Sequence, residues 1–492
     1  MSACCVVLAA LITPVPIPGA EGDHFAAAVD TLRRAATPSL RGDNHTLVVS
    51  LRAMRDPDLR SFFETLAQSG DWAGRIDGIL ALAELSPDQN IDPFMLSRLA
   101  EAGQRSAAIH GAIGLSLVQP GSAREILTWT DLNELDRVLL TAELQRRGEP
   151  WDAQPIRQIT ADERVPEEVR SLAAMLLLEA GDPEPWAEFS SRARELPAPR
   201  RNIILQEIGK AAQTYRLSAS VALLLELGAD EGTQPQTAGA LVGCALALDP
   251  KLGLDGWTNC VQRDRSGPAL LRGALQFLLF AEQLPADRVA AVRNGDPLIE
   301  AVADAAAAHS RGDDAVTAQR LCELISMGNR QTSEWAIRTA LRLPSAEAAA
   351  VLRHVLSQAQ GDSPAAPGLR GALVEVGARL VSWDAPAVRS AIENSTDPIC
   401  QELLLLGLNQ SASKQSAEVA SAVRKSLSRR ADALALLAMA RGLDSLDPQT
   451  LEALGLVAAG GAGIDPTLRV QAAWLFAKHS GRSAEALAAV HP

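Results

Sequence analysis

The chain has 492 residues, of which 47% are hydrophobic and 21% charged, and its formal net charge at pH 7 is −13. This acidic balance disfavours nucleic acid as a partner, because affinity for a phosphate backbone depends on Lys and Arg side chains that displace counterions. Aromatic residues make up only 3%, with Tyr215 the single tyrosine. The remaining apolar residues are mostly Ala, Leu and Val, of which Ala and Leu favour helices, so we predict an all-α protein.

The first 22 residues differ from the rest of the chain. Residues 3–12, ACCVVLAALI, form an uncharged apolar run, and Ala20 and Gly22 are small residues at the −3 and −1 positions of a cut after Gly22. Such a run is typical of a signal peptide and is too short to span a bilayer. We predict a signal peptide at 1–22 and an exported protein, periplasmic or extracellular. The alternative is a cytoplasmic protein with a frayed N-terminus, because no Lys or Arg precedes the run.

The rest of the chain, 23–492, is predicted to be one continuous series of helices of roughly 10 to 18 residues with apolar positions three and four apart. No later stretch is apolar enough to form a transmembrane helix. Helix starts are predicted at Asp-Pro pairs, because Asp caps free N–H groups and Pro suits the first helical position. These pairs begin at Asp56, Asp92, Asp182, Asp249, Asp296, Asp397, Asp447 and Asp465. Helix stops are predicted at Gly148, Gly181, Gly228 and Gly361.

A short pattern recurs along the chain: an apolar residue, Arg, two residues, a small or apolar pair, one residue and Leu. It is clearest in VPEEVRSLAAMLLLEAG, around Arg170, and in IDPTLRVQAAWLFAKHSG, around Arg469. Most successive copies lie about 30 residues apart, a period that indicates stacked helical hairpins. The pattern places marks at Arg75, Arg105, Arg137, Arg170, Arg201, Gln236, Arg272, Glu300, Arg338, Arg370, Gln401, Arg430 and Arg469.

At these residues the chain resembles the HEAT-repeat family, in particular the bacterial HEAT-like type related to phycobilisome lyases. The resemblance covers roughly residues 40–490 and is weakest around Gln236 and Glu300. Tetratricopeptide repeats share the period but need a framework of Trp, Gly, Tyr and Pro that this chain lacks. The resemblance implies a right-handed α-solenoid of about thirteen or fourteen helical pairs, with the Arg-bearing helix on the concave side.

The repeated Arg has two interpretations. It can bond the turn or acid of the adjacent unit, forming a ladder that sets the stacking, and we expect this for Arg75, Arg170, Arg338 and Arg469. The alternative is an anion-binding stripe. The two densest basic segments, 192–201 and 424–430, are interrupted by neutral or acidic residues and are predicted to be solvated helix ends.

The sequence carries no complete catalytic or metal-binding motif of the common kinds. SASK at 411–414 matches Ser-x-x-Lys, but its partner motifs are missing, so a helix N-terminal Ser is the better interpretation. The seven histidines are dispersed, and His110 is expected to be a packed or boundary side chain rather than a metal ligand. Arg-Gly-Asp at 41–43 and 311–313 fits helix connectors. We predict no catalytic residue, no cofactor and no metal site.

Cysteines and tryptophans are assigned to packing. Cys244, Cys260, Cys322 and Cys400 are scattered; a Cys244–Cys260 bridge is the minority expectation against two buried thiols. Inter-unit packing is likewise expected for the eight tryptophans, with an aromatic binding platform as the alternative. They are Trp72, Trp129, Trp151, Trp186, Trp257, Trp335, Trp383 and Trp474.

We therefore expect a non-catalytic scaffold that binds a protein partner along its concave surface, with no partner-binding residue that the sequence can name. Two enzyme alternatives remain open. A chromophore-lyase-like enzyme on a HEAT scaffold is implied by the family resemblance alone. A HEAT-like DNA glycosylase would need a basic channel, which the acidic composition disfavours.

Overall fold

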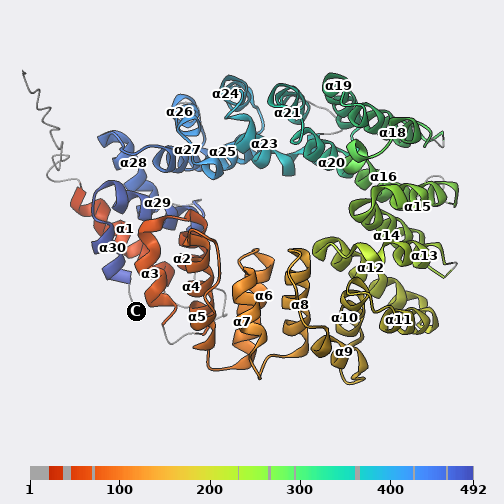
Figure 1. Ribbon diagram of the computed structural model, residues 1–492. Helices are drawn as coiled ribbons and strands as arrows, with labels where there is room; N and C mark the ends of the chain where they lie inside the picture. The colour runs from red at the N-terminus through yellow and green to blue at the C-terminus, as the bar shows by residue number, and fades with distance from the viewer. Residues whose placement is uncertain are drawn as a thin grey trace, which may run out of the picture. The chain divides into compact units, whose positions relative to one another are not determined.

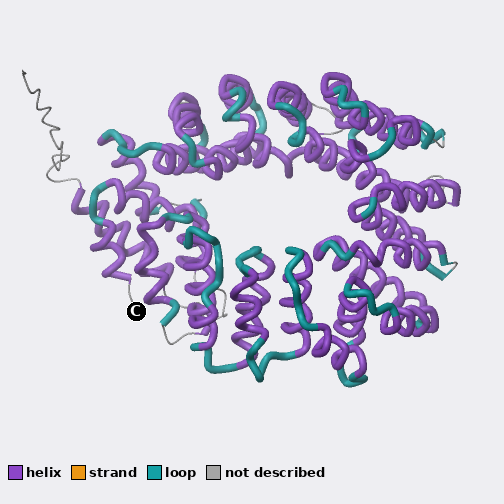
Figure 2. Tube along the Cα trace, in the orientation of Figure 1, coloured by secondary structure: helices purple, strands orange, loops and turns teal. Residues whose placement is uncertain are grey.

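The computed structural model describes residues 21–36, 46–68, 72–230, 232–263, 268–292, 295–360, 366–424, 427–460 and 464–490. Every regular element in these residues is a helix (Figure 2). Thirty of the elements are α-helices. The predicted all-α class is confirmed for this part of the chain. None of the described helices combines the length and apolarity that crossing a bilayer needs. Residues 1–20 of the predicted signal peptide lie outside the described residues.

The chain divides into two compact units, one formed by residues 1–54 and 443–492 and the other by residues 55–442. Unit 1 thus joins the two ends of the sequence. Its described helices are α1 (Glu21–Ala36), α2 (Thr46–Met54), α28 (Pro448–Ala459), α29 (Pro466–His479) and α30 (Ser483–Val490).

In unit 1, the N-terminal helices pack directly on the C-terminal ones. Helix α1 contacts α28, α29 and α30, and α2 contacts α29. The buried side chains of α1 include Phe25, Ala28, Val29 and Leu32, which have the i, i+3, i+4, i+7 spacing of one helix face. The apolar face of α1 is therefore covered by helices that lie more than 400 residues further along the chain.

Unit 2 is a series of helix pairs arranged in two layers, in which neighbours in the chain are also neighbours in space (Figure 1). Its first layer contains α4 (Trp72–Leu85), α6 (Ala102–Gly114), α8 (Glu134–Arg146), α10 (Glu167–Glu179), α12 (Ala198–Tyr215), α14 (Pro235–Leu248), α16 (Pro268–Phe280), α20 (Arg330–Ala340), α22 (Ala366–Leu369), α23 (Leu373–Leu380), α25 (Pro398–Ser411) and α27 (Arg429–Gly442).

The second layer of unit 2 holds the other helix of each pair. Its members are α3 (Arg60–Leu66), α5 (Pro93–Ser97), α7 (Pro120–Leu127), α9 (Ala153–Ala161), α11 (Glu184–Glu195), α13 (Val221–Ala229), α15 (Pro250–Arg263), α17 (Ala286–Ala290), α19 (Asp314–Ser326), α21 (Ser345–Gln360), α24 (Ala385–Asn394) and α26 (Lys414–Val423). The order is interrupted at one place, where α16 contacts both α18 (Pro297–Ser310) and α20.

The sequence pattern corresponds to a fixed position in these pairs. Eight of its marks occupy the fourth residue of their helix: Arg75, Arg105, Arg137, Arg170, Arg201, Glu300, Gln401 and Arg469. The other marks fall elsewhere in the helical segments, as with Arg338, the ninth residue of α20. A repeated helical unit is thereby confirmed. In α14, α16 and α20 the pattern falls at a different position of the helix.

Most of the predicted helix boundaries are correct. Seven of the eight Asp residues that precede Pro accept hydrogen bonds from backbone N–H groups at a helix start; the exception is Asp182, which pairs with Arg157. Gly148 and Gly181 end helices with positive φ, as predicted. Gly228 lies one residue before the end of α13, so the predicted stop is nearly correct, but it is not among the glycines with positive φ. Gly361 lies outside the described residues.

Several first-layer helices are buried all round instead of having one apolar face. Every residue is buried from Ser171 to Leu177 in α10, from Leu241 to Leu246 in α14 and from Ala433 to Ala440 in α27. A helix that is hydrophobic on all sides is one that neighbours enclose. Close approach is helped by glycine: a Cβ on Gly239 would lie 2.3 Å from the Ala269 carbonyl oxygen of α16.

Candidate functional site

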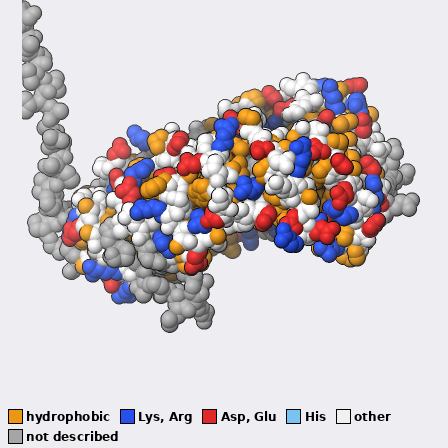
Figure 3. All heavy atoms as spheres, turned by 60° about the horizontal axis from the view of Figure 1, so that its bottom comes forward, with side chains coloured by type: hydrophobic (Ala, Val, Ile, Leu, Met, Phe, Trp, Pro, Cys, Tyr) orange, Lys and Arg blue, Asp and Glu red, His pale blue; other side chains and the backbone are white. Residues whose placement is uncertain are grey.

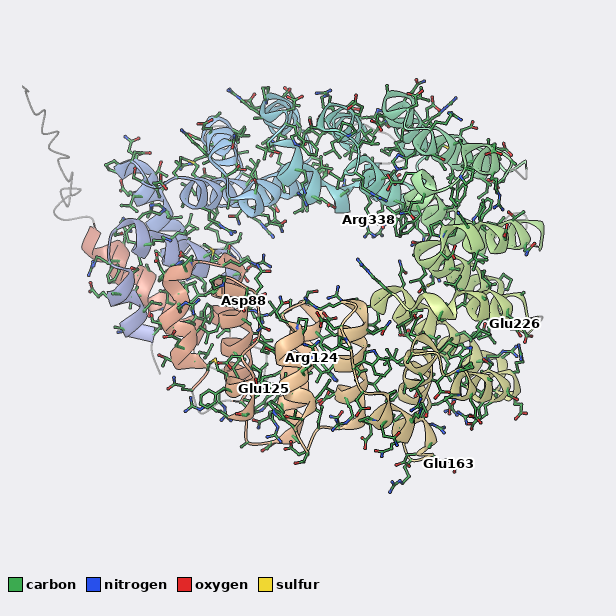
Figure 4. The ribbon with its side chains drawn as sticks, in the orientation of Figure 1. Asp88, Arg124, Glu125, Glu163, Glu226 and Arg338 are labelled. Carbon is green, nitrogen blue, oxygen red and sulfur yellow. The ribbon has the colours of Figure 1, made fainter. Side chains whose placement is uncertain are left out.

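A pocket of about 490 Å³ lies in unit 2 among α7, α8 and the start of α9, and we call it the α7–α9 pocket. Trp151 forms part of its wall and is half-buried. Figure 4 labels Arg124, which comes from α7. The lining residues are Arg124, Leu127, Thr128, Arg137, Thr141, Leu144, Pro150, Trp151, Asp152 and Pro155.

The two arginines of this pocket are bound within the chain. Arg137 donates from Nη1 to the Leu127 carbonyl oxygen at 3.0 Å and from Nη2 to the Trp129 carbonyl oxygen at 3.3 Å. Its charge thus neutralises carbonyls at the C-terminal end of α7, where the helix dipole is negative. Arg124 pairs with Glu149 in the loop before α9.

The other polar groups of the α7–α9 pocket also have local partners. The Trp151 indole N–H donates to Gln145 Oε1 at 2.8 Å, and the Thr141 hydroxyl donates to the Arg137 carbonyl oxygen at 2.8 Å. Thr128 donates to the Glu125 carbonyl oxygen, and Asp152 accepts from the Gln154 N–H that it caps. What the pocket offers a ligand is therefore mainly the apolar surface of its leucine, proline and tryptophan side chains.

Arginines that pair with an acid about one repeat away occur in both layers. At the positions of the recurring pattern they are Arg105, Arg370 and Arg430, which pair with Asp131, Asp397 and Glu402. A second set, not expected from the sequence, lies in the second layer. There an Arg pairs with an acid about one repeat away: Arg157 with Asp182 at 2.8 Å and Arg353 with Asp384 at 2.6 Å, for example. The hydrogen bond from Arg353 is the main cause that lowers the pKa of Asp384. Among the described residues of the second layer, these pairs are Arg124–Glu149, Arg157–Asp182, Arg194–Glu226, Arg288–Asp255 and Arg353–Asp384.

The four arginines named for that ladder behave differently. Arg170 pairs with Glu167 in its own helix, and Arg338 is exposed and lies over the Trp335 ring at 4.9 Å. Figure 4 shows Arg338 on α20 of the first layer and Glu226 on α13 of the second. Arg469 reaches Thr31 Oγ1 at 3.5 Å within unit 1. The Nε of Arg75 is buried, with no hydrogen-bond partner among the described residues.

Other first-layer marks bind the turn that precedes their own helix. Arg105 donates to the Leu99 carbonyl oxygen at 2.7 Å and pairs with Asp131. The uncharged Gln401 makes equivalent contacts, because its side-chain amide donates to the carbonyl oxygens of Ile392 and Ser395. The residue at this position thus ties the two helices of one pair together, and Arg105 in addition reaches the turn before the next pair.

The remaining candidates from the sequence take structural roles. His110 Nε2 lies 2.7 Å from Asp136, whose buried carboxylate also accepts a hydrogen bond from Ser106, so these groups link α6 to α8. Ser413 of the SASK segment caps α26. Asp313 of the second Arg-Gly-Asp caps α19; the first copy, at 41–43, lies outside the described residues. The described residues contain no group of three or more His, Cys, Asp or Glu that could hold a metal ion.

The four described cysteines are free thiols, so the Cys244–Cys260 bridge is not formed. Burial raises the pKa of Cys244 to about 11, and burial together with Asp397 raises that of Cys400 to about 11. Of the tryptophans, Trp186, Trp257 and Trp474 are fully buried, which confirms inter-helix packing for them.

The surface carries both signs of charge. On the face shown in Figure 3, Lys and Arg side chains alternate with Asp and Glu side chains and with hydrophobic ones over the described atoms. The basic segments 192–201 and 424–430 are neutralised in part by ion pairs, as between Arg194 and Glu226 and between Arg424 and Asp432. The exposed Arg194 and Arg200 agree with the interpretation as solvated helix ends, whereas Arg201 at the end of the first segment is buried.

No protein-family model matches the sequence, and no curated protein matches it. The comparison with solved structures matches two chains, both with TM-scores below 0.5. One is the full-length AP-3 complex in an intermediate open conformation, a homology model, with 11% identity over 94% of this chain and 93% of that chain and a TM-score of 0.40. The other is the crystal structure of an engineered protein, with 14% identity over 88% of this chain and 99% of that chain and a TM-score of 0.29.

The repeated helix pairs make this chain a helical-repeat protein. The α7–α9 pocket was not predicted from the sequence, because its residues form no motif. The one available signal was Trp151 flanked by Pro150 and Pro155, an aromatic residue in a stiff connector between two helices.

Proposed function

We propose that this protein is an exported, non-catalytic scaffold of the HEAT type, and that the α7–α9 pocket receives an apolar side chain of a protein partner. This use of the pocket is supported by its polar side chains, which already have hydrogen-bond partners within the chain. Arg137, Thr141 and Trp151 each donate to an acceptor within the chain. A ligand that enters therefore meets apolar walls, and burial of an apolar side chain there stabilises the complex.

An enzyme site would be built differently. Acid–base or electrostatic catalysis needs polar groups that converge on a reacting atom, and these groups must be free to contact it. Arg124 is engaged with Glu149, and Asp152 with the start of α9. The lyase-like and glycosylase-like enzymes are therefore less well supported than a scaffold.

The test is site-specific photo-crosslinking in native envelope extracts, followed by binding of the captured partner in purified form. A crosslinker replaces Pro155 at the pocket or, as a control, Glu226 on α13. We expect one partner peptide captured from Pro155 and not from Glu226. A synthetic copy of that peptide should bind the purified protein saturably, with an apolar side chain that the binding requires.

The matched variants are Thr128→Trp and Thr65→Trp. Both threonines are exposed and donate to a backbone carbonyl in their own helical segment, but only Thr128 lines the pocket. Filling the pocket should weaken peptide binding at least tenfold, a change of about 1.4 kcal/mol, while Thr65→Trp leaves it unchanged. Equal binding by both variants would refute the pocket as the site. Capture of a small metabolite in place of a peptide would favour an enzyme.

Export is tested separately by sequencing the N-terminus of the protein from its native source. We expect the mature chain to begin at Asp23 in an envelope or extracellular fraction. That cut would remove the first two residues of α1 and leave the buried Phe25, Ala28, Val29 and Leu32 in place. Recovery of the uncut chain from the cytosol alone would contradict export and leave the binding proposal standing.

A further inference from the structure

One titratable side chain is buried where the order of helices in unit 2 is interrupted. His309, in the last turn of α18, is 6% exposed, and neither of its ring nitrogens has a hydrogen-bond partner among the described residues. A neutral imidazole has one donor and one acceptor, so burial without partners is unfavourable. Buried polar groups without partners are rare in folded proteins and call for an explanation.

The surroundings of His309 form a junction among three helical segments. Glu282, in the short 3₁₀ helix Ala281–Gln283 that follows α16, places its Oε2 3.5 Å from His309 Nε2. Arg342, just after α20, pairs with the other oxygen of Glu282 and donates to the Leu279 carbonyl oxygen of α16. Glu282 thus lies between an arginine that holds it and a histidine that does not hydrogen-bond to it.

The contact from Arg342 to Glu282 spans 60 residues, about two repeats, whereas the ion pairs of the second layer span about one. It fastens the end of α20 to the end of α16 at the place where α16 contacts both α18 and α20. Ser310, next to His309, also donates to the Leu284 carbonyl oxygen on the same side. These polar contacts of Glu282, Arg342 and Ser310 thus lie next to or near His309 at the junction.

The charged groups that act on His309 come from each side of the junction. Glu282 and Asp314 of α19 favour its protonation, and Arg342 opposes it. Helix α17 also packs on α18, but its Arg288 pairs with Asp255 of α15. Burial is the largest influence, and it lowers the pKa of His309 from its ordinary value of 6.5.

We propose that His309 makes the junction of α16, α18 and α20 a pH-sensitive joint of the repeat array, closed near neutral pH and opened when the imidazole takes up a proton. The closed joint binds a proton less well than the opened one, where the imidazole reaches water. Opening is therefore favoured as pH falls below about 6.5, and the closed state is regained as pH rises. This inference does not depend on the α7–α9 pocket or on the identity of a partner.

The test is hydrogen–deuterium exchange of the full-length protein at pH 7.5 and pH 5.5, with the rates corrected for intrinsic exchange. Peptides that cover 279–284, 303–311 and 339–343 report on the joint, and peptides from α23 and α25 report on a regular contact. A difference of one pKa unit between closed and opened states corresponds to a roughly tenfold change in opening. We expect a several-fold rise in corrected exchange at pH 5.5 in the joint and none in α23 and α25.

Two substitutions make the test specific. His309→Leu removes the titrating group and its unpaired nitrogens, and should abolish the pH dependence at the joint. His354→Gln is the control, because burial lowers the pKa of His354 as well, but this residue lies on α21 beside Ser326. If His309→Leu fails to fold, His309→Met serves in its place. The proposal would be overturned if the pH response persisted in His309→Leu, or if it disappeared in His354→Gln.

Discussion

The Thr31 hydroxyl of α1 donates a buried hydrogen bond of 2.7 Å to the carbonyl oxygen of Ala458, 427 residues further along the chain. It joins the N-terminal helix to the end of α28. Two other contacts support the same connection: Arg33 Nε donates to the Ala489 carbonyl oxygen at 3.0 Å, and the Arg482 guanidinium lies 3.4 Å from the centroid of the Phe25 ring. The ends of the chain are thus held by polar and aromatic contacts in addition to apolar packing.

Removal of the Thr31 donor should weaken unit 1. Thr31→Val keeps the shape of the side chain but leaves the Ala458 carbonyl buried without this partner, which costs about 1–3 kcal/mol. We expect that loss in the free energy of unfolding and faster hydrogen exchange in 456–460. Thr65→Val is the control, because Thr65 is exposed and bonds only within its own helix. If both substitutions lowered the free energy of unfolding equally, the hydrogen bond between Thr31 and Ala458 would make no contribution to stability.

Glycines at helix crossings should separate into two classes. Gly239→Ala places a Cβ against the backbone of Ala269, so α14 and α16 must move apart, and we expect destabilisation of about 1–3 kcal/mol or more. Gly103, in α6, has nothing within 4 Å of a new Cβ. Gly103→Ala should therefore stabilise by about 0.5–1 kcal/mol. Chemical denaturation of both variants measures the difference, and the same sign in both would contradict the close contact.

The sequence could predict features within one helix pair but not the contacts between pairs. The repeat was readable because its signals are local: an Asp that caps a helix, or an Arg four residues into one, acts within its own pair. Contacts between pairs have no such signature. Arg157 meets Asp182 and Arg353 meets Asp384 only because of the stacking, so the sequence could not show that arginines of the second layer form such pairs as well. Apolar spacing alone also could not show that α10 and α27 are enclosed on all sides.

The two kinds of arginine should differ in energetic weight. Arg137 is partly buried and donates to two carbonyl oxygens, and hydrogen bonds from a charged group to such acceptors contribute about 1.5–3 kcal/mol. Arg157 is half-exposed and makes one ion pair, a contact that typically contributes about 0.2–1 kcal/mol. We expect Arg137→Met to lower the melting temperature clearly and Arg157→Met to change it little. A reversed order would refute the role of Arg137 in fixing α7 to α8.

Thiol reactivity should follow burial. Cys322 is partly exposed, whereas Cys244, Cys260 and Cys400 are buried. With a pKa of about 11 for Cys244 and Cys400, very little reactive thiolate is present at pH 8. In protein that carries Cys4→Ser and Cys5→Ser, mass spectrometry of a timed alkylation should find Cys322 modified first. The other three should react only on denaturation, and early modification of Cys400 would contradict its burial.

The meeting of the first and last helices in unit 1 has a consequence for incomplete chains. In most helical-repeat proteins a missing terminal repeat shortens the array and leaves its remaining interfaces intact. Here a fragment that lacks α1 would leave apolar surface of α28 to α30 in water, and a fragment that stops before α28 would do the same to Phe25 and Leu32. Either fragment would be prone to aggregation and degradation, because the apolar faces of α1 and of α28 to α30 cover each other when both are present.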